Sequence, residues 1–263
     1  MKIKNIVKVM NFHALLHIDA ARRMTEKYIR MESEVQKIID IIVNNRNFIL
    51  DKIALDPSEH APQLNIYIGS DYSFCGGMNK LVLNAMLKDT DAEKITVGRK
   101  MRVANLPGLK LAMTKDEFDE NYNEVEELLE DSVFRLRHSS INVIYNHYYN
   151  AGKIALRRRK VFPIPLAADP EGYTEDFVVE GNVDALLRRL TSTYASYEVK
   201  IASVNSFAAE NIMRQEATTE SLKKIEEIEE EQLRVQRKEA RLKAFAKAQD
   251  DYLKTVSYGE VQL

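Results

Sequence analysis

Two long stretches without glycine or proline, one towards each end of the chain, constrain the fold more than any other feature. The first extends to Pro57 and the second runs from Asn182 to Val256. In the first, mostly apolar residues recur at alternating spacings of four and three: Ile3, Val7, Met10, Ala14, His17, Ala21, Met24, Tyr28, Met31, Val35, Ile38, Ile42, Asn45 and Ile49. This heptad spacing predicts one helix of about 50 residues, spanning about 75 Å, which needs a partner helix along its seam.

The second stretch supplies a suitable partner. Its seam repeats the same spacing at Val183, Leu187, Leu190, Tyr194, Tyr197, Ile201, Val204 and Ala208. Between Ala209 and Ser221 we expect the phase to slip, before Leu222, Ile225 and Ile228 resume it ahead of a highly charged tract. A helix of about 75 residues reaches about 110 Å and extends several turns beyond the first. The pattern therefore predicts a long antiparallel two-helix coiled coil with one projecting end.

The middle of the chain has a different pattern, in which short apolar runs alternate with turns. Strand-like runs cover residues 63–70, 94–100, 141–150 and 153–166, the last of them an edge strand ending at prolines, and helix-like segments cover 78–89 and 117–140. Strands that alternate with helices favour a small open α/β sheet with parallel pairs. We therefore expect three parts: an N-terminal coiled-coil helix (1–56), an α/β head domain (57–181) and a C-terminal coiled-coil helix (182–263).

Composition limits the possible partners. Lys and Arg total 38 against 40 for Asp and Glu, so the chain has no overall basic field for nucleic acid or an anionic membrane. The single cysteine, Cys75, excludes an intrachain disulfide framework and suits a reducing cytosol. No run approaches the ~18 apolar residues of a membrane span, and no signal peptide is evident. We expect no direct membrane insertion, and association with a membrane only through a partner.

The segment "IYIGSDYSFCGGMNK", from Ile66 to Lys80, has the strand–glycine–helix order of a phosphate-binding loop. A Walker loop places lysine directly after the glycine and then a hydroxyl residue, whereas Met78 and Asn79 follow Gly77 here. The dinucleotide fingerprint Gly-x-Gly-x-x-Gly is absent as well. The alternatives are a nucleotide site and, as we favour, a tight strand-to-helix turn whose glycines permit positive φ. We expect no cofactor.

Three other groups of residues suggest chemistry, each beside a simpler interpretation. His13 and His17 lie four apart on one helix face and suit a metal, but no third ligand is evident, which favours a seam histidine beside its neighbour. The aromatic residues Tyr145, His147, Tyr148 and Tyr149 and the basic run Arg157 to Lys160 suit RNA stacking, or ordinary strand residues. The carboxylates of residues 119–131 indicate a solvated helix face rather than an acid–base pair.

The glycine segment also resembles a known family. "SDYSFCGGMN" resembles the Ser-Asp-x-Gly-Leu-Cys-Gly-Gly-x-Asn loop of the gamma subunit of F-type ATP synthases, the central rotor shaft. The matching residues are Ser70, Asp71, Cys75, Gly76, Gly77 and Asn79. Further similarities follow in the family's order: Lys8 with the basic pair Arg22 and Arg23, "VGRK" (Val97 to Lys100), "FPIPL", and Glu210, Arg214, Ala217 and Thr218 in the last helix. The resemblance covers almost the whole chain and agrees with the predicted architecture.

Two departures from the family stand out. The family's lysine-rich segment of the first helix is here "NFHALLHI", so Lys8 is nearly alone. Near the C-terminus the family has Asn-x-x-Arg-Gln-x-x-Ile-Thr, which by the resemblance contacts the catalytic beta subunits. An ungapped reading places Leu233, Gln236, Arg237, Ala240 and Arg241 at those positions. The chain therefore resembles a diverged gamma paralogue, and we expect the contacts of its tail to differ from those of the family.

The resemblance implies a fold, a function and partners. It implies a long antiparallel two-helix coiled coil with an inserted Rossmann-like α/β head, acting as the non-catalytic central stalk of an F-type ATPase on the cytoplasmic face of the cell membrane. The implied partners are the alpha and beta subunits, an epsilon-type subunit and a membrane rotor ring. Possible contacts of the shaft with the catalytic ring are Lys8, Met10, Arg237 and Arg241. The alternatives are the shaft of a dedicated hydrolytic ATPase and a static coiled-coil scaffold.

Overall fold

The computed structural model describes residues 2–44, 57–73, 75, 77–150, 153–164 and 181–259. It divides into two compact units. The main unit is Phe12–Gln215, and the terminal unit combines Met1–Asn11 with Glu216–Leu263. Within the described residues, no helix has the length and apolar composition needed to cross a membrane.

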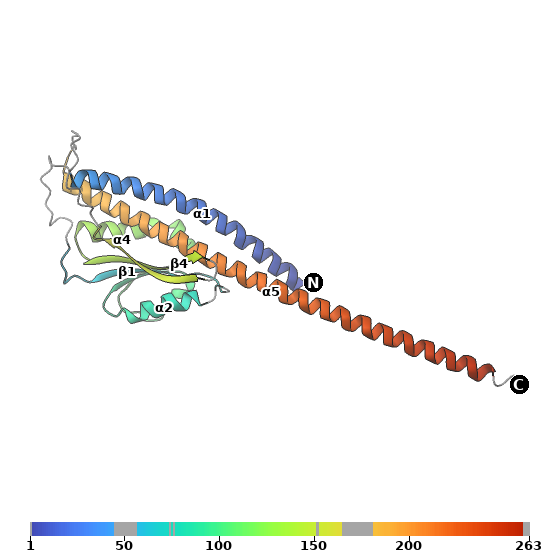
Figure 1. Cartoon of the computed structure of the whole chain (residues 1–263). Coiled ribbons are helices and arrows are strands. Elements are labelled where there is room, and N and C mark those ends of the chain that lie inside the picture. Colours follow the sequence, from blue (N-terminus) through green and yellow to red (C-terminus); the bar gives the residue numbers. More distant parts are fainter. Residues whose placement is uncertain are drawn as a thin grey trace. The chain divides into compact units, whose positions relative to one another are not determined.

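Two long helices, α1 (Lys2–Val43) and α5 (Val183–Gly259), confirm the helical prediction for the two ends (Figure 1). They pair antiparallel in each unit. In the main unit, Ile39 of α1 packs with Leu187, and the rings of His17 and Phe207 lie 5.3 Å apart between centroids. In the terminal unit, the Asn11 side-chain amide donates to the Thr218 hydroxyl at 2.9 Å. The predicted seam residues Asn45 and Ile49 lie outside the described residues.

Only one of the two sets of residues predicted for the seam of α1 is covered in the structure. The positions shared with the prediction recur every seven residues and are buried or half-buried: Val7, Ala14, Ala21, Tyr28, Val35 and Ile42. The second set is displaced by one residue, to Lys4, Asn11, Ile18, Thr25, Glu32 and Ile39. Of the set predicted in its place, Met10 is half-buried and the others are exposed: Ile3, His17, Met24, Met31 and Ile38. The prediction chose the more apolar set, but α1 has apolar residues on two faces and buries only one of them against α5.

The predicted phase slip in α5 is wrong. The covered positions keep the heptad spacing through Asn211 and Gln215 in the main unit and through Thr218, Leu222, Ile225 and Glu229 in the terminal unit. Ile228, predicted in the seam, is exposed. The heptad positions between Ala208 and Leu222 are occupied by polar residues instead of apolar ones. The apolar pattern is therefore interrupted although the heptad phase continues, and this interruption was mistaken for a phase slip.

The globular part is a five-stranded sheet in the order β3-β2-β1-β4-β5. Its strands are β1 (Gln63–Ile68), β2 (Glu93–Val97), β3 (Leu109–Met113), β4 (Ser140–Asn150) and β5 (Lys153–Phe162). Strands β1 to β4 run parallel, and β5 pairs antiparallel with β4 at the edge. The expected α/β sheet with parallel pairs is confirmed, as is the edge position of the last strand.

The local assignments need three corrections. The strand predicted over 94–100 ends at Val97 and is followed by a 3₁₀ helix, η2 (Arg99–Met101). The helix predicted over 117–140 is two helices, α3 (Lys115–Glu120) and α4 (Tyr122–Phe134), and α3 begins earlier because Thr114 and Glu117 form a capping box. Strand β3 was not predicted, because only its last residue, Met113, is buried, so the segment lacks a strong apolar pattern.

Helices cover both faces of the sheet (Figure 1). Helix α2 (Met78–Lys88) packs Val82 and Met86 against Tyr67 and Ile144. On the other face, α4 and α5 share one core with the strands, and Val199 is fully buried in it. The sheet-facing side of α5 is made of small or β-branched residues: Ala195, Val199, Ala202, Ser206 and Ala209. These residues repeat the heptad spacing, so α5 has a second packing face, which was not predicted from the sequence.

Candidate functional site: the glycine loop and its contact with the C-terminal helix

The family-like residues lie in the segment 69–79, which runs from the end of β1 into the first turn of α2; we call it the glycine loop. Asn79 closes it, since its side-chain carbonyl accepts from the Ser70 backbone N–H at 3.0 Å and its amide donates to the Ser70 hydroxyl at 2.9 Å. The same amide lies 3.2 Å from the Cys75 Sγ. The Ser70 hydroxyl in turn donates to the Tyr72 carbonyl at 2.9 Å. Three of the predicted residues are therefore brought together by one hydrogen-bond network.

Asp71 fastens the loop to two other segments. Its carboxylate accepts from the backbone N–H of Arg99 at 2.7 Å and from that of Lys115, the first residue of α3, at 3.2 Å. The Asp71 side chain is 1% exposed, and the Arg99 guanidinium lies 3.8 Å away. A buried carboxylate that receives backbone N–H donors and a nearby cation is satisfied within the fold, which indicates a structural role.

The loop also packs on α5. Cys75 and Met78 form a small buried cluster with Ala209. Beside this cluster, Arg214 is ion-paired with Glu210, and its guanidinium lies 5.5 Å from the centroid of the Tyr72 ring. Burial raises the pKa of the Glu210 carboxyl, although the Arg214 charge opposes this shift. The Glu-x-x-x-Arg motif of α5, Glu210 and Arg214, therefore lies beside the glycine loop.

The glycines do not all behave as expected. Gly76 lies outside the described residues, and Gly77 has φ −84°, so positive φ is wrong for Gly77. The glycine that the backbone requires is Gly98, which the sequence analysis did not single out. Its φ is +108°, and a Cβ there would lie 2.9 Å from the Gly69 carbonyl carbon and the Ser70 nitrogen. The approach of this backbone to the loop needs a residue without a side chain.

The structure does not assemble the histidine pair into a metal site within the described part of the chain, and it buries or pairs three of the aromatic and basic residues of β4 and β5. His13 and His17 are both exposed, with ring centroids 6.4 Å apart, and the described residues contain no group of three or more potential metal ligands. Tyr145 is buried in the core, so its ring is not available for stacking with RNA. The side chains of Tyr148 and Tyr149 lie outside the described residues. Two basic residues of the neighbouring run form ion pairs, Arg158 with Asp89 and Arg159 with Glu198.

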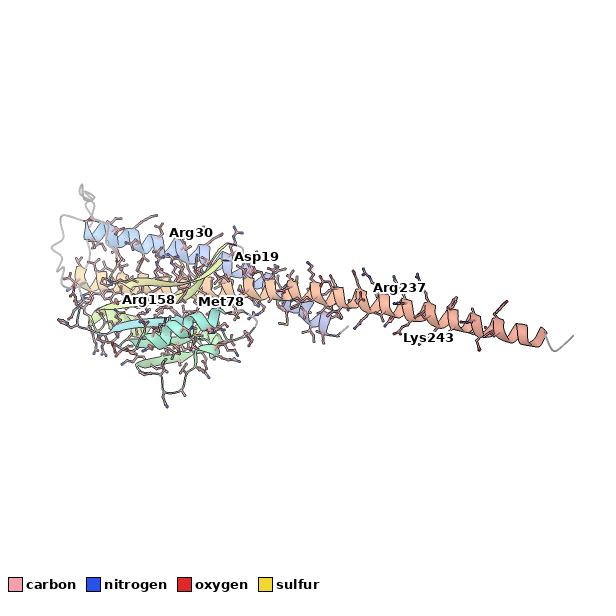
Figure 2. The ribbon with its side chains drawn as sticks, turned by 60° about the horizontal axis from the view of Figure 1, so that its bottom comes forward. Asp19, Arg30, Met78, Arg158, Arg237 and Lys243 are labelled. Atoms are coloured by element: carbon pink, nitrogen blue, oxygen red, sulfur yellow. The ribbon has the colours of Figure 1, made fainter. Side chains whose placement is uncertain are left out.

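The four predicted ring-contact residues all belong to the terminal unit. Lys8, Arg237 and Arg241 are exposed, and Met10 is half-buried. Figure 2 shows the side chains of Arg237 and Lys243 projecting from α5. These residues are separate in sequence from the glycine loop, which lies in the main unit.

Comparison with known proteins agrees with this arrangement. A family model described as ATP synthase matches residues 1–246. The chain is 26% identical to the ATP synthase gamma chain of Clostridium novyi over 227 residues, covering 81% of this chain and 79% of that one. It is 22% identical to the ATP synthase gamma chain of Campylobacter jejuni over 236 residues, covering 82% and 80%.

The fold has a counterpart among solved structures. A chain in the cryo-EM structure of the Tetrahymena thermophila mitochondrial ATP synthase central stalk and c-ring aligns with a TM-score of 0.55 and 18% identity. The alignment covers 82% of this chain and 99% of that one. The chain belongs to the ATP synthase gamma family, whose members form the central stalk.

Proposed function

We propose that this chain is the non-catalytic rotor shaft of an F-type ATPase, and that it couples ATP hydrolysis or synthesis in a catalytic ring to rotation and proton transport. The observation that supports this most is the bare end of α5. Every residue from Glu230 to Leu253 is exposed in the terminal unit. The exposed residues include large apolar ones: Leu233, Val235, Leu242, Phe245, Tyr252 and Leu253. A lone helix is marginal in water, so a stretch of this kind needs a surrounding partner.

We assign the partners by region. The two helical regions, 1–56 and 182–263, would form the shaft, with Lys8, Met10, Arg237 and Arg241 facing the alpha and beta subunits. The region 57–181 would face an epsilon-type subunit and the membrane rotor ring. The complex would then hold the chain at the cytoplasmic face of the cell membrane without inserting it into the bilayer. No role for nucleic acid is proposed.

The shaft would act through asymmetry. A single chain in the middle of a ring of several catalytic subunits contacts them unequally, because its two helices differ in residues and length. Each rotational position would stabilise different open and closed subunits, so the coupling is a difference in contact free energy between states. This mechanism requires no catalytic group on the chain itself.

A second candidate is the shaft of an ATPase that only hydrolyses ATP. The residues at the family's tail-contact positions favour it: Leu233, Gln236, Arg237, Ala240 and Arg241 replace the usual set. Reconstitution of the complex in vesicles distinguishes the two candidates. A synthase makes ATP when a proton gradient is imposed, whereas a dedicated hydrolase shows ATP hydrolysis and no synthesis.

A reversible crosslink tests the rotor proposal. In a Cys75→Ser background, Ala244→Cys on the bare stretch is paired with a cysteine on a facing ring subunit. A disulfide forms only when the Cα atoms come within about 7 Å, so efficient bridging places this stretch inside the ring. We expect the bridge to stop steady ATP turnover and reduction to restore it. A matched control is Lys80→Cys on the exposed side of α2, which should not bridge to the same ring cysteine.

The crosslink also tests the scaffold alternative. A static scaffold predicts equal ATP turnover in bridged and reduced complexes, because it requires no relative movement. Full turnover in a completely bridged sample would therefore contradict the rotor proposal. Copurification adds a second requirement, since a shaft should be present at one copy per catalytic ring.

A further inference from the structure

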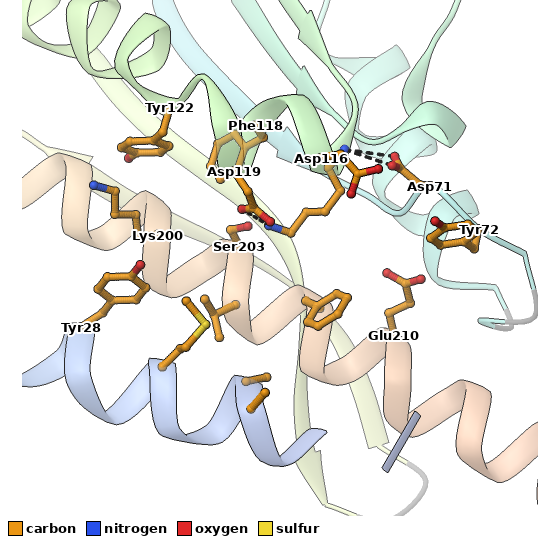
Figure 3. Close-up of a pocket in the computed structure, with 16 residues that line it drawn as sticks. Tyr28, Asp71, Tyr72, Asp116, Phe118, Asp119, Tyr122, Lys200, Ser203 and Glu210 are labelled. Atoms are coloured by element: carbon orange, nitrogen blue, oxygen red, sulfur yellow. Dashed lines mark hydrogen bonds and ion pairs between the residues drawn. The ribbon is translucent and has the colours of Figure 1, made fainter. Parts of the chain in front are cut away.

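The main unit contains a cavity of about 390 Å³ that plays no part in the proposed rotor function. It lies where α1, α5, the start of the α3–α4 segment and the glycine loop meet (Figure 3). Its apolar lining includes Met24 of α1 with Val204 and Phe207 of α5. Its volume falls within the range of small-molecule sites, which are commonly apolar with a few polar groups.

An unsatisfied hydroxyl lines this cavity. Ser203 of α5 is 2% exposed, and its Oγ has no hydrogen-bond partner among the described residues. Neighbouring serines on the same helix are satisfied: Ser196 donates to Glu126 at 2.8 Å, and Ser206 donates to the Ile68 carbonyl at 3.4 Å. Buried polar groups in proteins are normally paired, so the Ser203 hydroxyl is available for a polar atom of a bound molecule.

The charges around the cavity favour a cation. Four carboxylates line it, those of Asp71, Asp116, Asp119 and Glu210, against two ammonium groups, those of Lys115 and Lys200. These four carboxylates have three cationic partners, which leaves an excess of one negative charge: Arg99 lies 3.8 Å from both Asp71 and Asp116, Lys115 pairs with Asp119, and Arg214 pairs with Glu210. Both lysines already have carboxylate partners, since Lys115 pairs with Asp119 and Lys200 with Glu126 at 2.9 Å. An anionic ligand would therefore meet excess negative charge and no unpaired cation.

The rings on the head side are covered by the same two lysines. The Lys200 ammonium lies 4.1 Å from the centroid of the Tyr122 ring, and the Lys115 ammonium lies 5.1 Å from that of Phe118. Figure 3 shows Ser203 and Lys200 projecting from α5 towards the side formed by Asp119 and Tyr122. The apolar lining that these lysines do not cover includes Met24, Val204 and Phe207, which a bound apolar group can contact.

We propose that this cavity binds a small arylalkylamine, an organic cation with an apolar ring and an ammonium group. The ammonium donates a hydrogen bond to the Ser203 Oγ and gains from the excess negative charge of the carboxylates that line the cavity. The ring packs against Met24, Val204 and Phe207. Nucleotides and other phosphates are disfavoured by the same charges. The inference is independent of the rotor function, because it concerns a site within the main unit of the chain alone.

Three probes of nearly equal size and different charge test the proposal: 2-phenylethylamine, 2-phenylethanol and phenylacetate. Each is titrated into the full chain by calorimetry at neutral pH. We expect saturable binding of the amine, at least about tenfold tighter than that of phenylacetate, with the alcohol between them. The amine should also raise the thermal midpoint, because a ligand that binds only the folded state stabilises it.

Two variants and one control locate the binding. Ser203→Ala should weaken amine binding several-fold and leave the chain folded, because it removes a hydroxyl that has no partner. Ala20→Leu, at a half-buried position of the cavity wall, should fill the space and abolish binding. Ser192→Ala removes a hydroxyl of α5 that does not line this cavity, and it should leave binding unchanged.

Three outcomes would overturn the proposal. They are no saturable binding of the amine, binding of phenylacetate as tight as that of the amine, and amine binding that survives Ala20→Leu. Circular dichroism of each variant establishes that it is folded, so loss of binding is not mistaken for loss of structure. If Ala20→Leu unfolds the chain, Met24→Phe is the replacement, because Met24 is partly exposed on the same wall.

Discussion

Residues 183–215 and residues 230–253 belong to the same helix, α5, and differ in what covers them. In the first stretch, α1 covers one side and the sheet with α4 covers another, so Ala195, Val199 and Ala202 are almost completely buried. In the second stretch every residue is exposed, including Phe245 at 71%. Both stretches lack glycine and proline, and both are helical.

This difference separates two sources of helix stability. The first stretch is stabilised mainly by burial of its own apolar surface, which the chain provides for itself. The second has only helix propensity and charged pairs within the helix, each of which contributes a few tenths of a kcal/mol, so a partner must cover its apolar residues. A substitution should therefore have opposite consequences in the two stretches: loss of folding in one and loss of assembly in the other.

The largest expected effect is that of Val199→Asp. Val199 of α5 is fully buried in the core that α5 shares with the sheet and α4. An unpaired carboxylate there should lower the free energy of unfolding by about 4 kcal/mol or more. The matched change in the bare stretch, Leu242→Asp, should alter it by less than about 0.5 kcal/mol, because Leu242 is exposed. Urea unfolding of the isolated chain measures both. A comparable loss in the two variants would contradict the proposed difference between the two stretches of α5.

The packing side of α1 gives the next effect. Ile39 is completely buried against α5, whereas its neighbour Ile38 is 46% exposed. Ile39→Asp should lower the free energy of unfolding by about 3 kcal/mol, and Ile38→Asp by less than about 1 kcal/mol. The sequence spacing alone predicts the reverse order, so urea unfolding of this pair decides between the two seams. A larger loss for Ile38→Asp would show that the structural register is wrong.

A buried acid in the covered stretch should make stability depend on pH. Burial raises the pKa of Glu198 to about 7, with Arg159 lowering it and Glu32 raising it further. Between pH 4.5 and about 7, the folded chain retains a proton that the unfolded chain has lost, so stability should fall as the pH rises. Over this window we expect wild type to lose about 1 to 3 kcal/mol more than Glu198→Gln.

The measurement for Glu198 is urea unfolding of both proteins across that pH range. The quantity to compare is the difference in unfolding free energy between the two proteins at each pH, because the contributions of all other titrating groups cancel in it. Parallel profiles for wild type and Glu198→Gln would contradict the prediction, and so would a wild-type stability that rises more steeply with pH than that of the variant.

The smallest effect is expected in the glycine loop, which packs on the end of the covered stretch at Ala209. Gly77 has negative φ and no atom within 4 Å of an added Cβ, so Gly77→Ala should change the free energy of unfolding by less than about 0.5 kcal/mol. Gly98→Ala is the control, and it should cost about 2 kcal/mol because of positive φ and close backbone. Thermal unfolding compares them, and equal midpoints for the two variants would refute this assignment of the required glycine.

Much of the architecture was predictable, because a long helix that packs along one side has apolar residues at a regular spacing in the sequence. The heptad spacing predicted both long helices and their antiparallel pairing, and the alternation of strands with helices predicted a parallel sheet. The missed strand, β3, buries little, and the break between α3 and α4 occupies the single residue Asn121, so neither produces a long periodic signal. The loop residues Ser70, Asp71, Cys75 and Asn79 were found by resemblance, whereas Gly98 lies outside the matched loop and became evident only from its backbone.

The two long helices, the helix α2 and four of the five strands were evident from the sequence alone, because propensity and periodicity act locally. The sequence did not determine which of the two apolar faces of α1 is buried, since both have the heptad spacing and the choice depends on the residues that α5 presents. It also did not reveal the second face of α5, where small residues allow the sheet to approach, or the unsatisfied Ser203 hydroxyl. These features arise only when segments distant in sequence come into contact, because burial and hydrogen bonding depend on what lies opposite each side chain.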